Sequence, residues 1–329
     1  MKVICYGVRE TDLPYFKEHN TYGYEILLND ELLSHTTVGL AKGALAVMLR
    51  SNCKANRENL KSLADRGVKY ILTRTVGYNQ IDLAAAKEYG LKVANVPVYS
   101  PNAIGELAVT LAMMLLRNLA YTTNNTKDKN FSVNKTMFSR EIRMCKVGII
   151  GTGSIGLTTA KLFKGLGADV IAFDVRENPN ADEVLKYVPF HTLLEESDII
   201  SIHIPYVKGQ NEKLINKDFL SRMKSDALLI NTSRGELQDD GEILNAILNN
   251  TIGGFATDVF ATEDKYFYKN FQGRPLPDET VEKLISCYPK VLVTPHIGSY
   301  TKVAASNMIK ISYDNLNEFI TFGKCKNQL

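Results

Sequence analysis

The sequence predicts an α/β protein with two doubly wound parallel-sheet domains. Three observations lead to this prediction. Short apolar runs alternate with helical or loop patterns along most of the chain, which is typical of parallel strands joined by crossover helices. The length of 329 residues is enough for two domains that each bury a core. A glycine-spaced turn at residues 151–156 stands near the start of the second series of strands.

The first hundred residues contain four apolar runs of strand length. The loops that follow three of them begin at Arg50, Arg74 and Pro97. Because these loops lie at the carboxyl ends of parallel strands, they are expected to face a ligand. The predicted strands are residues 3–6, 44–49, 70–73 and 93–96.

A long apolar helix is predicted over residues 103–119, with Ser100, Pro101 and Asn102 at its start. Its apolar residues occur on nearly every side, so we expect it to be buried in a core or in a subunit interface. The polar stretch 121–143 is expected to be irregular, either wrapping over a neighbouring surface or forming an ordinary surface loop.

The stretch 146–156 runs from a short apolar strand through a glycine-spaced turn into a helical pattern. Gly151 permits a tight bend, Gly153 leaves room for a pyrophosphate, and Gly156 lets the helix pack close to the sheet. The helix N-terminus then offers free N–H groups to phosphates. The alternative is a strand-to-helix turn whose glycines serve packing alone.

A second strand over residues 168–174 ends on Asp174. This position is at the offset of about twenty residues at which a carboxylate can hold the adenosine ribose hydroxyls. Since the carboxylate would repel a 2′-phosphate, NAD is favoured over NADP. Strand, turn, helix, second strand and acid together predict a dinucleotide-binding turn that favours NAD.

The alternation continues to the end of the chain. A last helix from about residue 301 to 322 is expected to return to the first domain. The expected domains are residues 1–100 with 300–329, and residues 101–299. Further strands are predicted at 198–203, 227–231, 254–258 and 291–294, and helices at 193–197, 216–223 and 239–249.

Composition excludes several classes of function. The net charge of +3 with no long run of like charge argues against nucleic-acid and acidic-membrane partners. The five cysteines are scattered, which suggests reduced thiols in a cytoplasmic protein. No His, Cys and carboxylate cluster has metal-ligand spacing, so no catalytic metal is expected. Residues 1–7 are expected to form a strand rather than a signal peptide.

Three side chains that can do chemistry follow strands of the second series: Arg234, Glu263 and His296. Arg234 can hold a substrate carboxylate through two parallel N–H bonds. His296 can exchange a proton near neutral pH, and a nearby Glu263 would fix its orientation and favour the charged imidazole. Taken singly, such an arginine is commonly a surface salt-bridge former and such a histidine a capped turn residue.

Four motifs, at residues 99–106, 151–156, 231–235 and 294–296, closely resemble the NAD-dependent D-2-hydroxyacid dehydrogenases, in particular the D-lactate dehydrogenase-like branch. The resemblance covers essentially the whole chain. It implies a flavodoxin-like substrate domain hinged to a Rossmann domain, usually as a homodimer, and Arg234, Glu263 and His296 as the catalytic set. It also implies that Val76 and Gly77 offer backbone N–H groups to the substrate carboxylate and that Tyr99 borders the pocket.

The same resemblance implies a set of contacts to NAD beyond the three glycines. This sequence departs from the family pattern in places: Ser154 stands where arginine or histidine is usual, and Gly105 where alanine is usual. Residues 238–240 read Gln-Asp-Asp in place of Val-Asp-Thr. The implied cofactor contacts are Ser154, Ile155, Asp174, Ile204, Pro205, Asn211, Thr232, Ser233, Arg234 and Asp258.

Arg50 is the best indication of the substrate. Lactate-specific relatives usually have an aromatic or neutral residue there, and a second cation suits a second carboxylate. The sequence therefore looks most similar to (R)-2-hydroxyglutarate dehydrogenases acting on 2-oxoglutarate. If Arg50 instead faces solvent or pairs with Glu58, the substrate would be pyruvate or a branched or aromatic 2-oxoacid. An NAD(H)-sensing binding protein, like the corepressors that share this fold, is the alternative from another functional class.

Overall fold

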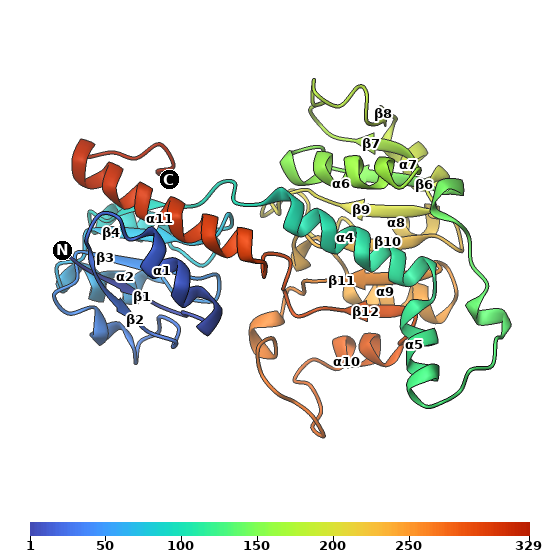
Figure 1. Ribbon diagram of the computed structural model, residues 1–329, viewed down its shortest axis with the longest axis horizontal. Helices are drawn as coiled ribbons and strands as arrows, with labels where there is room; N and C mark the ends of the chain where they lie inside the picture. Colours follow the sequence, from blue (N-terminus) through green and yellow to red (C-terminus); the bar gives the residue numbers. More distant parts are fainter. The chain divides into compact units, whose positions relative to one another are not determined.

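The structure is a computed structural model that describes all residues from Met1 to Leu329. It divides into two compact units, the first made of Met1–Ser100 with Tyr300–Leu329 and the second of Pro101–Ser299. Each unit is built around one wholly parallel sheet, as Figure 1 shows. The predicted fold class, two doubly wound parallel α/β domains, is confirmed.

The sheet of the first unit has the order β2-β1-β3-β4-β5, which is the flavodoxin-like order. The strand order reverses between β1 and β3, so the loops after these two strands flank a crevice of the kind that binds ligands. The edge strand β2 was not among the predicted strands, and most of its side chains are exposed. The strands are β1 (Lys2–Cys5), β2 (Glu25–Leu28), β3 (Ala46–Leu49), β4 (Tyr70–Thr73) and β5 (Lys92–Ala94).

Both faces of this sheet are covered, because alternate strand residues point to opposite sides. Val47 and Ile71 pack on one face with α2 (Arg57–Asp65) and α3 (Leu83–Glu88). On the other face, Met48 and Leu72 meet α1 (Leu13–His19) and α11 (Lys302–Phe322), whose Tyr313 and Phe319 are fully enclosed. The last helix therefore packs in the first unit. Two short 3₁₀ turns, η1 (Glu10–Asp12) and η2 (Val38–Ala41), complete it.

The second unit has seven strands in the order β12-β11-β10-β9-β6-β7-β8. Numbered from β6, this is the Rossmann order with one strand added at the edge, and its switch point lies between β6 and β9. The two-residue strand β8 was not predicted. The strands are β6 (Lys146–Ile150), β7 (Asp169–Phe173), β8 (Lys186–Tyr187), β9 (Ile199–Ile202), β10 (Leu228–Asn231), β11 (Gly254–Thr257) and β12 (Val291–Val293).

Helices cover both faces of this sheet as well. On one face, α4 (Pro101–Leu116) and α6 (Ser154–Gly165) pack against alternate residues of β6, β9 and β10. Gly105 allows this packing, since a Cβ there would lie 3.1 Å from Thr159 Oγ1 on α6. The other face carries α7 (Phe190–Glu196), α8 (Lys217–Arg222), α9 (Asp240–Leu248) and α10 (Glu279–Ser286).

The helix predicted over residues 103–119 is wrong at its end. α4 stops at Leu116, Asn118 has a left-handed φ of 48°, and a second helix, α5 (Leu119–Lys127), follows at a bend of 68°. α5 lies in the stretch expected to be irregular, and its threonine hydroxyls donate to carbonyls of their own helix. No single helix is both long and apolar enough to cross a membrane, and only the bent pair of α4 and α5 together reaches that length and composition.

Candidate functional site

The glycine turn after β6 is shaped by three different constraints. Gly151 has a φ of +92°, and a Cβ on it would lie 2.6 Å from the carbonyl oxygen of His203. A Cβ on Gly156 would lie 1.8 Å from the carbonyl oxygen of Gly151, closer than any real contact. A Cβ on Gly153 would meet nothing within 4 Å, so the space over this residue is open. The turn thus lies at the β6/β9 switch point and leaves a cradle above Gly153.

The surroundings of this cradle fit an NAD pyrophosphate and ribose. No side chain caps the N-terminus of α6, whose first residues are Ser154 and Ile155, so its N–H groups remain available to an anion. Thr232 Oγ1 is buried without any hydrogen-bond partner in the protein. Asp174, at the end of β7, accepts hydrogen bonds from Thr152 N and Oγ1 at 2.6 and 3.1 Å, which fix its carboxylate beside the turn.

Most of the other predicted cofactor residues belong to the loops after β9 and β10. A Cβ on Gly151 would lie 2.7 Å from Ile204 Cγ2, so this loop forms one wall of the turn. The Asn211 amide accepts from Val207 N and donates to the Pro205 carbonyl, which holds the loop closed on itself. Ser233 Oγ donates to the Ile202 carbonyl at 2.5 Å and joins the loop after β10 to β9.

His203, directly after β9, packs against the glycine turn. Its Nε2 lies 2.8 Å from Ser201 Oγ, and its carbonyl contacts the glycine turn. Burial lowers the pKa of His203 to about 3, so the ring is neutral near pH 7. This histidine is therefore poorly suited to donate a proton to a substrate.

His296 and Glu263 form a pair at the ends of two neighbouring strands, β12 and β11. Nδ1 of His296 lies 2.7 Å from Oε1 of Glu263. Because a carboxylate only accepts, we assign the ring proton to Nδ1, which leaves Nε2 to exchange a proton with another molecule. The His296 side chain remains 30% exposed, so a ligand can reach it.

The backbone of His296 is strained, with a φ of +51°. Such conformations cost about 1–3 kcal/mol and persist where surrounding contacts hold them. Here Tyr268 Oη donates to the His296 carbonyl at 3.1 Å, and His296 N donates to the Thr294 carbonyl at 3.0 Å. Backbone strain of this kind is concentrated at functional sites.

Asp258 anchors the turn that carries His296. Its carboxylate accepts from Thr294 Oγ1 at 2.6 Å and from the N–H groups of Ile297 and Gly298, both at 2.8 Å. Burial raises the pKa of Asp258 above its usual value, and the hydrogen bonds from Thr294 and Ile297 partly oppose that rise. Asp258 therefore has a structural role that the sequence did not reveal, and its contact with NAD stays a prediction.

Arg234 follows β10, the strand next to β11. One guanidinium nitrogen, Nη1, donates to the Ser233 carbonyl at 2.7 Å, and the other N–H groups remain available for a ligand. The next residue, Gly235, packs so closely that a Cβ there would lie 2.1 Å from the backbone of Phe260. Phe260 N in turn donates to Glu263 Oε2 at 3.2 Å. The loops bearing Arg234, Glu263 and His296 are therefore in contact at one edge of the sheet.

The predicted substrate residues of the first unit lie at the carboxyl edge of its own sheet. Arg50 follows β3, and its Cβ and Cδ lie 3.4 and 3.6 Å from where a Cβ on Gly7 would be, so it crosses the β1/β3 switch point. After β4, the N–H groups of Val76 and Gly77 make no hydrogen bond within the protein, while their carbonyls accept from Asn95 and Thr75. Tyr99 accepts a bond from Asn307 Nδ2 through its carbonyl.

Arg74, just before this loop, was not recognised as a candidate. Its guanidinium is buried, pairs with Asp12 at 3.1 Å and donates to the carbonyls of Tyr6 and Gly7. It therefore ties the end of β1 to the end of β4. The sequence signal was an arginine directly after a predicted strand and before Gly77, but its burial and its partners Asp12, Tyr6 and Gly7 appear only in the structure.

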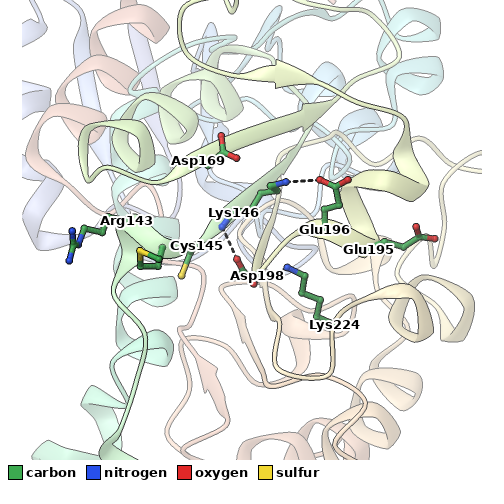
Figure 2. A pocket seen from close by; sticks show the side chains of 9 residues that line it. Arg143, Cys145, Lys146, Asp169, Glu195, Glu196, Asp198 and Lys224 are labelled. Carbon is green, nitrogen blue, oxygen red and sulfur yellow. Dashed lines mark hydrogen bonds and ion pairs between the residues drawn. The ribbon is translucent and has the colours of Figure 1, made fainter.

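A separate hollow of about 660 Å³ lies at the amino ends of β6, β7 and β9, the opposite edge from the glycine turn (Figure 2). Two ion pairs join residues of its lining: Lys146 with Glu196 at 2.6 Å, and Lys224 with Asp198 at 3.0 Å. We assign no role to this hollow. None of the predicted site residues lines it.

Comparison with known proteins agrees with this geometry. Residues 109–298 match the family described as D-isomer specific 2-hydroxyacid dehydrogenase, NAD binding domain. The chain is 37% identical to an aromatic 2-oxoacid reductase of Clostridium sporogenes over 330 aligned positions, covering 100% of this chain and 99% of the relative.

Solved structures match over the full length. A D-lactate dehydrogenase from Treponema pallidum has a TM-score of 0.90 at 32% identity, covering 100% of this chain and 99% of that chain. The NAD complex of a D-isomer specific 2-hydroxyacid dehydrogenase from Lactobacillus delbrueckii ssp. bulgaricus has a TM-score of 0.84 at 35% identity, covering both chains completely. The chain therefore belongs to the D-isomer specific 2-hydroxyacid dehydrogenases and is an NAD-dependent oxidoreductase.

Proposed function

We propose that this chain reduces a 2-oxoacid to the (R)-2-hydroxyacid with NADH, and that 2-oxoglutarate is the favoured substrate. The observation that carries the reaction is the 2.7 Å contact between His296 and Glu263. This pair stands on the same sheet edge as Arg234 and the glycine turn. An oriented imidazole, a guanidinium and a dinucleotide cradle are the groups that this reduction needs.

The proposed reaction is 2-oxoacid + NADH + H⁺ to (R)-2-hydroxyacid + NAD⁺. NADH supplies the hydride. Arg234 holds the substrate carboxylate through its available N–H groups, which fixes the carbonyl in place, and such orientation supplies much of the acceleration. His296 Nε2 gives its proton to the carbonyl oxygen as that oxygen becomes an alkoxide. Glu263 stabilises the imidazolium before the transfer and holds the ring in one orientation.

The cofactor is held by the groups around the glycine turn. In the proposal the N–H groups of α6 and the space above Gly153 receive the pyrophosphate, and Asp174 receives the ribose hydroxyls. Thr232 Oγ1 gains the hydrogen-bond partner that it lacks within the protein. Ile155, Ile204, Pro205, Asn211, Ser233, Arg234 and Asp258 complete the proposed contacts.

The choice of 2-oxoglutarate rests on Arg50. Its side chain lies at the β1/β3 switch point of the first unit. The unbonded N–H groups of Val76 and Gly77 lie in the loop after β4, the next strand of the same sheet. There we propose that Arg50 pairs with the distal carboxylate, while the loop contacts the proximal one and Tyr99 borders the side chain. The neighbouring Arg57 lies on the exposed face of α2, where it pairs with Glu88 at 2.6 Å.

A second candidate substrate class is supported by the comparisons. A relative that aligns over 99% of its length is named an aromatic 2-oxoacid reductase, and a structural neighbour is named a D-lactate dehydrogenase. An aromatic 2-oxoacid or pyruvate is therefore the alternative, and it carries no distal carboxylate for Arg50.

A panel of 2-oxoacids assayed by NADH absorbance tests the proposal. We expect the highest kcat/KM with 2-oxoglutarate, lower values with pyruvate and phenylpyruvate, and poor activity with NADPH. If phenylpyruvate or pyruvate has the highest kcat/KM, the assignment of 2-oxoglutarate is rejected and the proposed reaction stands. If none of the 2-oxoacids is turned over, the proposed reaction is rejected and an NAD(H)-sensing protein is favoured.

Replacing Arg50 with alanine is expected to raise the KM for 2-oxoglutarate by about tenfold or more, because a charge-assisted hydrogen bond is lost. The KM for pyruvate should stay unchanged, since pyruvate has no second carboxylate. Steady-state kinetics with both substrates measure this difference. The matched control is Arg57→Ala, which removes an exposed arginine of α2 from the same unit. Equal effects of Arg50→Ala on both substrates would contradict the second-carboxylate role.

We also propose that the protein is a cytoplasmic homodimer. All five cysteines are free thiols, which suits a reducing compartment. The segment after α5 exposes Phe131, Val133 and Phe138 by 77%, 87% and 89%, apolar surface that a second copy could cover. Sedimentation velocity tests the dimer, and a monomer at micromolar concentration would refute it.

A further inference from the structure

We propose that Gln238 is a positioning residue that holds the loop carrying Arg234 against the loop carrying Glu263. The side chain is only 4% exposed and stands just after the 3₁₀ turn η5 (Gly235–Leu237). The resemblance to the family places valine here, so this amide is a feature of this chain. The inference rests on the proposed function, in which Arg234 binds the substrate carboxylate.

The carbonyl oxygen of the Gln238 amide is connected to the Arg234 loop through Asn231. Gln238 Oε1 accepts a hydrogen bond from Asn231 Nδ2 at 2.7 Å, fully buried. The same Nδ2 donates to the backbone carbonyl of Arg234 at 3.0 Å, and Asn231 Oδ1 accepts from Ser233 N at 3.0 Å. The Asn231 side chain thus bonds to the backbone of both Ser233 and Arg234, and Gln238 fixes the orientation of the Asn231 amide.

The nitrogen side of the same amide reaches the neighbouring loop. Gln238 Nε2 donates to the Val259 carbonyl at 3.3 Å and to Asp240 Oδ1 at 2.8 Å. Val259 lies between Asp258, which anchors the His296 turn, and Phe260, whose N–H donates to Glu263. One buried side chain therefore connects the loop of the guanidinium with the loop that orients the imidazole.

This connection matters because the substrate must meet both groups at once. A shift of about 1 Å between catalytic groups can cost about a hundredfold in rate. Leucine at position 238 has nearly the volume of glutamine but would leave one Asn231 N–H buried without an acceptor. The Val259 carbonyl would lose its bond from Gln238 and keep only the one from Thr257 Oγ1 at 2.8 Å. Relief of that penalty requires the two loops to move apart or to admit water.

Gln238→Leu is expected to lower kcat/KM for the 2-oxoacid by about tenfold, through KM and kcat together. The NADH Kd should change far less, because the proposed pyrophosphate and ribose contacts at the glycine turn and Asp174 lie outside both loops. NADH fluorescence titration and steady-state kinetics measure the two quantities. Leu284→Ala is the control for lost stability, since this buried residue of α10 lies outside both loops. The control should lower the unfolding midpoint and leave kcat/KM unchanged. An unchanged kcat/KM in Gln238→Leu, or a parallel loss of NADH affinity, would overturn the inference.

A double-mutant cycle with Arg234→Lys separates this inference from the proposed function. If Gln238 acts through Arg234, Gln238→Leu should cost much less kcat/KM in the Arg234→Lys background than in the parent. Additive effects of the two substitutions would overturn the positioning role and leave the role of Arg234 intact. If Arg234→Lys alone leaves the 2-oxoacid KM and kcat unchanged, the proposed function itself fails.

Discussion

Replacing His296 with glutamine is expected to lower kcat for 2-oxoacid reduction by about 10²–10⁴-fold, the contribution typical of a positioned general acid. Glutamine keeps the approximate size and polarity of the ring but cannot supply a proton at neutral pH. The NADH Kd should be unchanged, because the glycine turn lies elsewhere on the sheet edge. Steady-state turnover and fluorescence titration of the same preparation measure both quantities.

Glu263→Gln provides the graded comparison for His296. It removes the charge that lies 2.7 Å from Nδ1 and preserves a hydrogen-bond acceptor. We expect an intermediate loss of kcat, since the imidazole remains but its charged form loses an ion pair. Near-parent turnover in His296→Gln would refute its role as the acid, whatever the result with Glu263→Gln.

Gly156→Ala is expected to weaken NADH binding by at least about a hundredfold, or about 2.7 kcal/mol. The added Cβ would lie 1.8 Å from the carbonyl oxygen of Gly151, so the turn and α6 must separate and the cradle is lost. Fluorescence titration with NADH measures the loss. Because both groups in the overlap belong to the backbone, no side-chain rearrangement can relieve it.

Two other glycines of the same region test this explanation. Gly165→Ala, at the far end of α6, meets nothing within 4 Å and should leave NADH binding unchanged. Gly153→Ala also has open space in the protein alone, so the unfolding midpoint without cofactor should be kept while NADH affinity falls. Normal NADH affinity in Gly156→Ala would contradict the assignment of this turn.

The sequence was sufficient to predict the parallel sheets and most of their elements. Alternating apolar runs and caps such as Asp239 and Thr301 produce strong local patterns, and the structure has the corresponding strands and the helices α9 and α11. The family and the enzyme class also followed from four local motifs taken together, at residues 99–106, 151–156, 231–235 and 294–296. The cofactor followed from the glycine turn in its context of strand, helix, second strand and acid.

The missed elements lack such local signals. α5 is a polar helix that begins directly after the left-handed Asn118, and β2 is an exposed edge strand stabilised by pairing with β1. α10 is short, and its apolar residues Val281 and Leu284 show their role only where they meet the core. These elements depend on tertiary contacts that a single sequence does not display.

At the candidate site, the functional residues were predictable from the sequence, but the contacts that hold them in position were not. Arg234, Glu263 and His296 follow predicted strands, and parallel strands place their loops on one edge. The positive φ of His296 is held by contacts with residues that lie elsewhere in the sequence. The Gln238 amide connects Asn231 with Val259, which also lie apart in the sequence. Both features can be identified only from a three-dimensional structure.

A crystal structure with NADH and oxamate, an unreactive pyruvate analogue, tests the central claim most directly. The account predicts that both N–H groups of one edge of Arg234 contact the oxamate carboxylate, and that His296 Nε2 lies about 2.6–3.2 Å from the adjacent carbonyl oxygen. The nicotinamide ring should face the same carbonyl carbon. Oxamate bound in that complex away from Arg234 and His296 would contradict it.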